Sequence, residues 1–168
     1  QRQMCIRDRV MNEVQFVKHQ VFRETPDVIF YDISVENNNA TDLVEHTGPA
    51  VSPPDENGDK QFYIHYHQVD HNRVLSGGRT FELVNPDWSD PYHIVHLNRD
   101  SGALIIPKGT YHRSTSSIHG SIVINQAVRD KDFDHTTEFV PVIARQNTLL
   151  YSILNEYKPI IHYKYFNK

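Results

Sequence analysis

The chain has 168 residues, 38% of them hydrophobic, a size that suits one domain with a full core and a short tail. Its net charge is −4 and its basic residues form no stripe, so we expect no nucleic-acid partner. No apolar run approaches the roughly 20 residues of a membrane span, so we expect no membrane insertion.

The first ten residues carry no hydrophobic periodicity and no capping signal, and we interpret residues 1–10 as a non-native leader before Met11. The single cysteine, Cys5, lies in this leader, so we expect no intramolecular disulfide framework. No charged-then-apolar signal peptide is evident in the sequence, and we therefore predict a cytoplasmic protein.

From residue 14 onward, short runs of β-branched and aromatic residues alternate with turn residues, which predicts short β-strands. The predicted strands cover residues 14–17, 28–35, 62–68, 71–76, 79–84, 92–97, 103–106, 110–116 and 121–128. The pair Gly77-Gly78 is predicted as a turn, and residues 36–60, rich in Asn, Gly and Pro, as a long irregular loop. This strand spacing is typical of an all-β sandwich or barrel.

The hydrophobic period changes near the C-terminus. Apolar residues from Leu149 to Tyr157 recur at helical spacing until Pro159, which predicts an amphipathic helix over residues 147–157. We therefore expect an all-β domain over residues 11–140 and a C-terminal helix and tail over residues 141–168.

Histidines supply the pattern that carries chemistry. His65 and His67 are two residues apart, so in a β-strand their side chains point to the same face, and His71 keeps that parity. His112 follows the turn signal Pro107-x-Gly109, which would bring a second strand back across the first. Neutral imidazoles that converge from neighbouring strands are typical of a divalent-metal site.

The spacing resembles the two motifs of the cupin superfamily over about residues 58–128. The first is His65-x-His67, three residues, His71, six residues and Gly78; the second is Gly102, four residues, Pro107-x-Gly109, two residues and His112. This resemblance implies an all-β cupin jelly-roll barrel (a double-stranded β-helix) with, in this chain, a short C-terminal helix.

The resemblance also implies a metal centre. Its predicted ligands are His65, His67, His112 and a fourth residue, for which strand parity favours His71 over Asp70. Cupins usually place Glu where His71 stands. Fe(II) is the favoured ion, and Ni, Cu, Mn and Zn are the alternatives.

Five further residues are predicted to bind a small-molecule substrate, while no catalytic residue is assigned. Tyr63 shares a face with His65, and Ser114 shares one with His112. Gln126, in apolar company, needs a polar partner such as a metal-bound water. Arg73 and Arg79 are candidate anion clamps, with solvated strand residues as the alternative.

Three functions are compatible with this pattern. Residues 106–113 resemble a stretch of acireductone dioxygenases, which favours a metal-dependent, non-haem dioxygenase. Residues 74–77 and 81–83 resemble cupin-type sugar-nucleotide epimerases and ketoisomerases, enzymes that use His and Tyr as acid and base without a metal. Their usual Arg-Gly-x-His sequence is absent here. The third alternative is a non-catalytic cupin that binds a small molecule.

We also predict a homodimer. Residues 14–17 and 163–166 carry more apolar surface than the edge segments of a monomer should expose, and pairing with a second copy would cover them.

Overall fold

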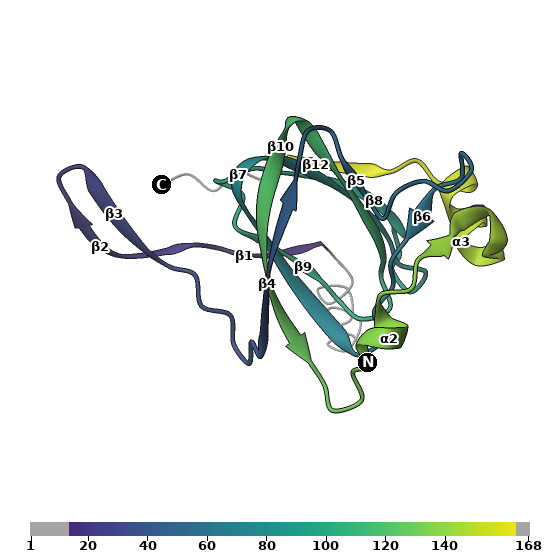
Figure 1. Ribbon diagram of the computed structural model, residues 1–168, viewed down its shortest axis with the longest axis horizontal. Helices are drawn as coiled ribbons and strands as arrows, with labels where there is room; N and C mark the ends of the chain where they lie inside the picture. The colour runs from purple at the N-terminus through teal and green to yellow at the C-terminus, as the bar shows by residue number, and fades with distance from the viewer. Residues whose placement is uncertain (1–13, 164–168) are drawn as a thin grey trace, which may run out of the picture.

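The computed structural model describes residues 14–163, and it is built almost entirely of β-strands. The strands form a barrel, and two short helices pack on one side of it (Figure 1). The prediction of an all-β cupin jelly roll with a short C-terminal helix is confirmed. The predicted leader over residues 1–10 lies outside the described residues. Within residues 14–163, no helix has the length and apolar character that crossing a bilayer requires.

Two long antiparallel strands, β7 (Gln68–Val84) and β10 (Tyr111–Arg129), form the centre of the main sheet. The sheet runs in the order β1-β9-β7-β10-β4, while β8 also pairs with β7, β5 with β10, and β12 runs parallel to β8. These neighbours are β1 (Gln15–Val17), β4 (Ala40–His46), β5 (Val51–Ser52), β8 (Tyr92–Leu97), β9 (Ala103–Ile106) and β12 (Ile160–Tyr163).

The predicted turn at Gly77-Gly78 is wrong, because β7 continues through both glycines. Opposite them, the register of β10 shifts between Ser116 and Ser121, so both strands bend without ending. Gly77 has a φ of +74°, and a Cβ atom there would collide with the Gly120 carbonyl oxygen. The glycine therefore permits the backbones of β7 and β10 to cross closely, whereas the sequence predicted that it forms a hairpin turn.

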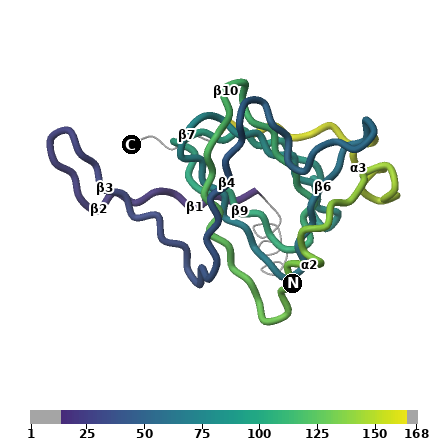
Figure 2. Tube along the Cα trace, in the orientation of Figure 1, coloured from purple at the N-terminus to yellow at the C-terminus, as the bar shows by residue number. Residues whose placement is uncertain are grey.

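The loop predicted over residues 36–60 contains two strands, β4 and β5, both paired with β10. The sequence did not predict β4 because the hydrophobic pattern of this segment is weak, and its Leu43 is 68% exposed. The strand forms by pairing with β10, about 80 positions further along the chain; His46, for example, pairs with Ser121. Strand β2 (Gln20–Thr25) pairs only with β3 (Val28–Asp32), and this hairpin, the arm, projects from the barrel (Figures 1 and 2).

The strand predicted over residues 62–68 is interrupted. β6 (Gln61–Phe62) ends after two residues, Tyr63 makes an isolated bridge with His112, and the chain bends at residues 66–67 before β7 begins. The bridge has two backbone hydrogen bonds, from the Tyr63 amide to the His112 carbonyl at 2.9 Å and from the His112 amide to the Tyr63 carbonyl at 2.8 Å. The break matters for the site, because strand parity cannot be counted across it.

Two hydrophobic clusters hold the fold. One lies inside the barrel around Phe81, Leu83 and Val95, and the other joins the barrel wall to helix α3 (Thr148–Glu156). Leu150 and Ile153 project from α3 into the second cluster, as the helical spacing predicts. The Asn147 side chain caps the helix by accepting a hydrogen bond from the Leu150 amide at 3.0 Å. β11 (Val142–Ile143) pairs with β6, and β12 pairs with β8, so the predicted tail is partly sheet.

Candidate functional site

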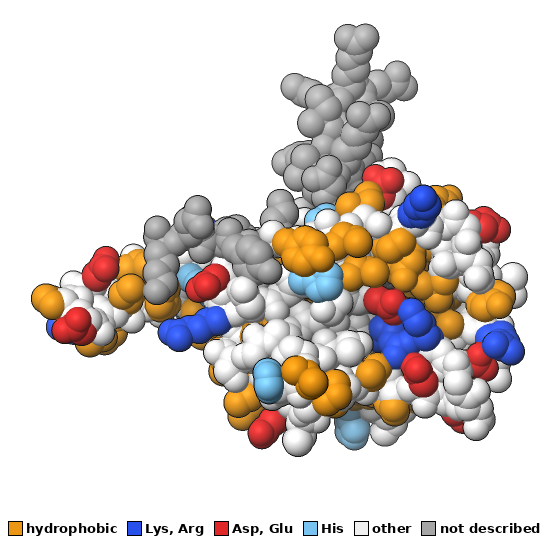
Figure 3. All heavy atoms as spheres, turned by 90° about the horizontal axis from the view of Figure 1, so that it is seen from above, with side chains coloured by type: hydrophobic (Ala, Val, Ile, Leu, Met, Phe, Trp, Pro, Cys, Tyr) orange, Lys and Arg blue, Asp and Glu red, His pale blue; other side chains and the backbone are white. Residues whose placement is uncertain are grey.

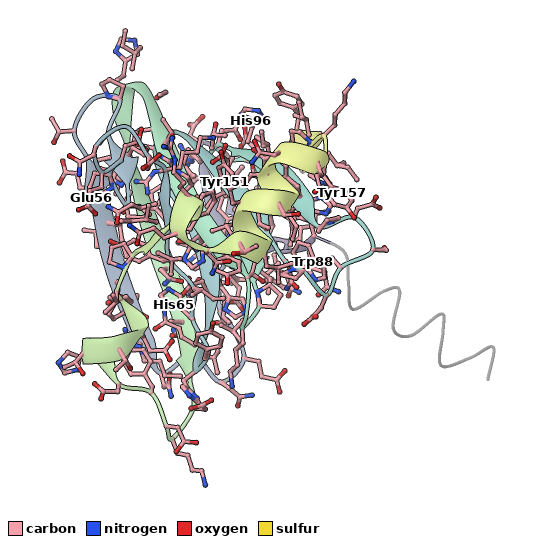
Figure 4. The ribbon with its side chains drawn as sticks, turned by 90° about the vertical axis from the view of Figure 1, so that its right-hand side faces the viewer. Glu56, His65, Trp88, His96, Tyr151 and Tyr157 are labelled. Atoms are coloured by element: carbon pink, nitrogen blue, oxygen red, sulfur yellow. The ribbon has the colours of Figure 1, made fainter. Side chains whose placement is uncertain are left out.

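Two buried histidines and one buried aspartate meet inside the barrel. The Nε2 atoms of His65 and His112 each lie 3.6 Å from Oδ2 of Asp70, and the ring centroids of the two histidines are 4.8 Å apart. All three side chains are buried. His65 lies on the side of the barrel where α2 (His135–Glu138) and α3 pack (Figure 4). Their ligand-type atoms lie within 4.8 Å of one another, so these are also the residues whose spacing would fit a metal ion.

Backbone carbonyls fix the tautomer of both histidines. Nδ1 of His65 is 2.9 Å from the Glu138 carbonyl oxygen, and Nδ1 of His112 is 3.0 Å from that of Thr110. Because a carbonyl oxygen only accepts, both Nδ1 atoms carry the hydrogen, and in the neutral rings both Nε2 atoms present a lone pair. Two proton acceptors therefore face the Asp70 carboxylate.

The Asp70 carboxylate is held by two amide groups. Its Oδ1 accepts hydrogen bonds from Nε2 of Gln68 at 2.6 Å and from Nδ2 of Asn125 at 2.8 Å. Gln68 is itself oriented by Arg129, whose Nε donates to Gln68 Oε1 at 2.8 Å. With Oδ1 occupied, Oδ2 is left to interact with the imidazoles.

Burial controls the charge of His112. Desolvation lowers the pKa of His112 to about 4; the neighbouring Asp70 carboxylate opposes this shift, and His65 adds to it. His112 is therefore neutral at pH 7, with its Nε2 lone pair free to accept a proton or a hydrogen bond.

The predicted fourth ligand, His71, does not face this cluster, and Asp70 takes its place. His71 lies on the other face of β7, where its Nδ1 donates to the Gln126 carbonyl at 2.9 Å. The bend at residues 66–67 shifts the strand parity by one residue, so that Asp70 points inward with His65 and His112.

His67 also points away from the other two motif histidines. Its Nδ1 lies 3.0 Å from Oδ2 of Asp130, which also accepts a hydrogen bond from Lys108 Nζ at 2.7 Å. Asp132 completes this second, more exposed group. The hydrogen bond from Lys108 holds the pKa of Asp130 well below its usual range. The structure thus brings together only two of the four predicted ligands.

Of the predicted substrate residues, Tyr63 lies next to the cluster and two others lie deeper in the barrel. The Tyr63 ring is stacked against His65, with centroids 6.4 Å apart and planes 14° from parallel. Arg79 is buried on the inner face, where its Nε donates to Ser121 Oγ at 2.7 Å and its Nη1 to Ser114 Oγ at 3.5 Å. Burial lowers the pKa of Arg79 to about 10.

The remaining two predicted substrate residues lie on the outer face of the sheet. Gln126 donates from Nε2 to the Ile33 carbonyl at 2.9 Å, so its polar partner is the chain after β3. Arg73 faces a cavity beside the arm. Neither side chain reaches the histidine cluster.

Sequence reasoning missed two residues that shape the site. Asn125 supports Asp70 and also accepts from the His71 amide at 3.0 Å. Glu138, at the end of α2, is buried, and its Oε2 accepts from the backbone amides of Tyr66 and His67 at 3.0 and 3.3 Å. A charged residue with no apolar periodicity around it gives no sequence signal that it folds back over a histidine 73 positions earlier.

No family model matches the chain, and no curated protein matches it in sequence. The fold is nevertheless shared by several solved sugar-nucleotide enzymes. A dTDP-6-deoxy-D-glucose-3,5-epimerase from Legionella pneumophila, in complex with dTDP-4-keto-L-rhamnose, has a TM-score of 0.59 at 10% identity, covering 90% of this chain and 84% of that one. A dTDP-4-dehydrorhamnose 3,5-epimerase from Bacillus anthracis, with TDP and PPi bound, has a TM-score of 0.57 at 12% identity, covering 89% of both chains.

A TDP-quinovose 3,4-ketoisomerase from Campylobacter jejuni is similar too, with a TM-score of 0.56 at 16% identity over 76% of this chain and 91% of that one. These findings overturn the favoured sequence prediction. The metal-dependent dioxygenase, with Fe(II) or with Ni, Cu, Mn or Zn, is wrong, since the shared fold is that of the sugar-nucleotide class, which the sequence resemblance describes as metal-independent. The chain has the fold of the RmlC-like cupins, that of dTDP-sugar 3,5-epimerases and 3,4-ketoisomerases.

Proposed function

We propose that the chain is a metal-independent epimerase or ketoisomerase acting on a keto sugar linked to a nucleotide. The observation that carries this proposal is the buried cluster of His65, Asp70 and His112, placed inside a barrel whose solved relatives by fold are enzymes of this class. The Bacillus anthracis structure holds TDP and the Legionella pneumophila structure holds dTDP-4-keto-L-rhamnose, which supports a nucleotide-linked sugar as the small-molecule substrate.

The chemistry begins with removal of a proton from the carbon next to the keto group. The Nε2 lone pair of His65 takes the proton, the C–H electron pair forms a carbon–carbon double bond, and the carbonyl π pair moves to oxygen to give an enolate. The Asp70 carboxylate, 3.6 Å from Nε2, stabilises the imidazolium that forms. Positioned proton transfer of this kind typically accelerates a reaction by about 10²–10⁴-fold.

The second half of the reaction returns a proton. Delivery to the opposite face of the same carbon inverts it, which is epimerisation. The keto group shifts instead when that carbon carries a hydroxyl group: the double-bond pair takes a proton at the former carbonyl carbon, the hydroxyl loses its hydrogen and becomes the new carbonyl, and the enolate oxygen takes up that hydrogen as a proton. Tyr63 is the proposed acid, because its ring lies against both histidines, at centroid distances of 6.4 and 6.2 Å. Neutral His112, whose Nε2 accepts, is proposed to hold a hydroxyl group of the sugar or to relay the proton.

The proposed phosphate contacts lie further along the barrel. Arg79 pairs in register with Ser116, four residues beyond His112 on β10 and about 14 Å along the strand. Described hydrogen-bond partners of Arg79 are hydroxyl and carbonyl oxygens, so the guanidinium keeps its positive charge available for an anion. Arg79 and Ser114 therefore remain proposed substrate-binding residues.

Deuterium exchange tests this function. We expect the full chain to exchange hydrogens flanking the keto group of dTDP-4-keto-L-rhamnose in D₂O, followed by NMR, and His65→Gln to reduce the rate by about 10²-fold or more. His71→Gln is the matched control, because it removes an imidazole six residues away that faces the other side of β7. Exchange that survives His65→Gln, or that stops when a chelator is added, would contradict the proposal. Binding of TDP without exchange would favour the non-catalytic alternative.

We further propose that the chain forms a homodimer through the arm, since Val14 and Phe16 of the predicted interface pack against the core of their own barrel. The arm exposes Phe22 at 68% and Val21 at 48%, and hydrophobic side chains are visible along it (Figure 3). A second copy would cover this apolar surface by the same contact on both sides. Residues 164–166, the other part of the predicted interface, lie outside the described residues. Cytoplasmic localisation stays a prediction of the sequence.

A further inference from the structure

A cavity of about 650 Å³ lies on the outer face of β7, away from the histidine cluster. Its polar lining consists of Lys18, His19, Tyr31, Arg73, Arg99 and Asp100. It lies between the sheet and the segment that enters the arm, since Lys18 and His19 form the link from β1 to β2 and Tyr31 belongs to β3. Three cationic side chains face one carboxylate, so the cavity favours an anion.

Arg73 is the buried cation of this cavity. Its side chain is 2% exposed, and its Nε and Nη2 atoms have no hydrogen-bond partner among residues 14–163. Burial lowers the pKa of Arg73, and no described carboxylate offsets that effect. A buried cation without a counter-charge is costly, and a buried donor without an acceptor adds to that cost.

His19 does not supply the missing negative charge. Its Nε2 lies 3.0 Å from the Arg99 carbonyl oxygen and must donate to it, so its Nδ1 accepts from Nη1 of Arg73. His19 is thus a neutral partner for one of the three nitrogens of the guanidinium. The other two, Nε and Nη2, lie on the same edge of the planar group, the edge that binds carboxylate or phosphate with two parallel hydrogen bonds.

We propose that this cavity binds a small phosphate-type oxyanion through Nε and Nη2 of Arg73. Both donors are buried, and the anion reaches them when the His19 ring, carried by the two-residue link between β1 and β2, moves aside. Lys18 and Arg99 then add charge from the rim of the cavity. The bound anion would tie the arm to the barrel. The site is separate from the proposed catalytic cluster, because Arg73 and Asp70 project from opposite faces of β7.

Calorimetric titration of the full chain with inorganic phosphate tests the proposal without any sugar substrate. We expect Arg73→Gln to weaken phosphate binding about tenfold or more, because two charge-assisted hydrogen bonds are lost. The phosphate affinity of Arg73→Lys should lie between those of the native chain and Arg73→Gln, since lysine keeps the positive charge but lacks the edge with two parallel donors. Lys158→Gln is the matched control, as it removes one exposed positive charge remote in sequence from every lining residue, and it should bind phosphate like the native chain.

Thermal unfolding gives a second readout. Phosphate should raise the Tm of the native chain and leave that of Arg73→Gln unchanged. If Arg73→Gln does not fold, the double variant Lys18→Gln/Arg99→Gln replaces it and should weaken phosphate binding several-fold. Equal phosphate affinity in native chain and variants would overturn the proposal. So would the absence of phosphate binding together with loss of self-association in Arg73→Gln, because the cavity would then be filled by a second copy of the chain.

Discussion

His112 should make the protein lose stability in mild acid. Its pKa falls from the usual 6.5 to about 4 in the folded protein, chiefly because the ring is buried. Between these two values the unfolded chain binds a proton at His112 that the folded protein does not, so the free energy of unfolding rises with pH across this window. The contribution is fully present above pH 6.5 and is lost as the pH falls toward 4. A tenfold change in proton affinity is worth about 1.4 kcal/mol, so a pKa that falls from 6.5 to about 4 lowers the free energy of unfolding in acid by about 3 kcal/mol.

Urea unfolding at a series of pH values between 4 and 8 measures this effect in the native chain and in His112→Gln. The native chain should lose about 3 kcal/mol more than the variant between pH 7 and 4. The matched control is Leu83→Ala, which changes the register partner of His112 in β7 and should cost about 2–5 kcal/mol at every pH. Parallel pH profiles for the native chain and His112→Gln would refute the reasoning, because they would show that His112 is protonated equally in the folded and unfolded states.

Three further outcomes are expected. Gly77→Ala should lower the free energy of unfolding in urea by about 2–4 kcal/mol, because the new Cβ meets the Gly120 carbonyl oxygen at a residue that already has a positive φ. Gly58→Ala, at a φ of +82° with nothing within 4 Å of its Cβ, should lower it by about 1–2 kcal/mol. Equal losses would show that the close crossing of β7 and β10 is unimportant. Asn125→Leu should slow deuterium exchange into the keto-sugar substrate about tenfold and shift the pH profile of that exchange, because Oδ1 of Asp70 loses a hydrogen-bond donor. An unaltered pH profile would show that Asn125 does not position the Asp70 carboxylate. Phe22→Ser should weaken the proposed dimer at least about tenfold in sedimentation velocity, and an unchanged sedimentation coefficient would show that the arm is not part of an interface.

The histidine motif was a partial guide to the site. The rings of His65 and His112, two of the motif histidines, lie 4.8 Å apart inside the barrel, because the strand after the Pro107-x-Gly109 turn bridges to Tyr63, two residues before His65. The motif failed for His67, whose partner is Asp130, 63 positions away. A motif gives the spacing of residues along one segment, whereas a side chain's partner is set by whichever segment folds against it.

The choice between Asp70 and His71 shows where strand parity stops being valid. Alternation of faces holds within one regular strand, and the two residues lie beyond a bend at residues 66–67 that no local turn signal marks. The same reasoning explains Arg73, which lies on the outer face of the sheet, whereas Gln126 lies on that face of β10 beyond the register shift between Ser116 and Ser121. The displacement before β7 sets the face of Asp70, His71 and Arg73, and the irregularity at Gly77 changes the parity again, so that Arg79 points inward.

The sequence by itself determined the all-β class and the C-terminal helix, because period-2 and period-3.6 hydrophobic patterns are local properties of the chain. The jelly-roll barrel was implied by the resemblance of the histidine and glycine motifs to the cupin superfamily. The sequence also predicted that histidines form the candidate site. Only the tertiary structure decided that an aspartate completes the cluster, that β7 and β10 bend through Gly77 where a turn was predicted, and that Arg73 is a buried cation beside the arm. These features depend on contacts between segments far apart in the sequence, and such contacts leave no periodic trace in either segment alone.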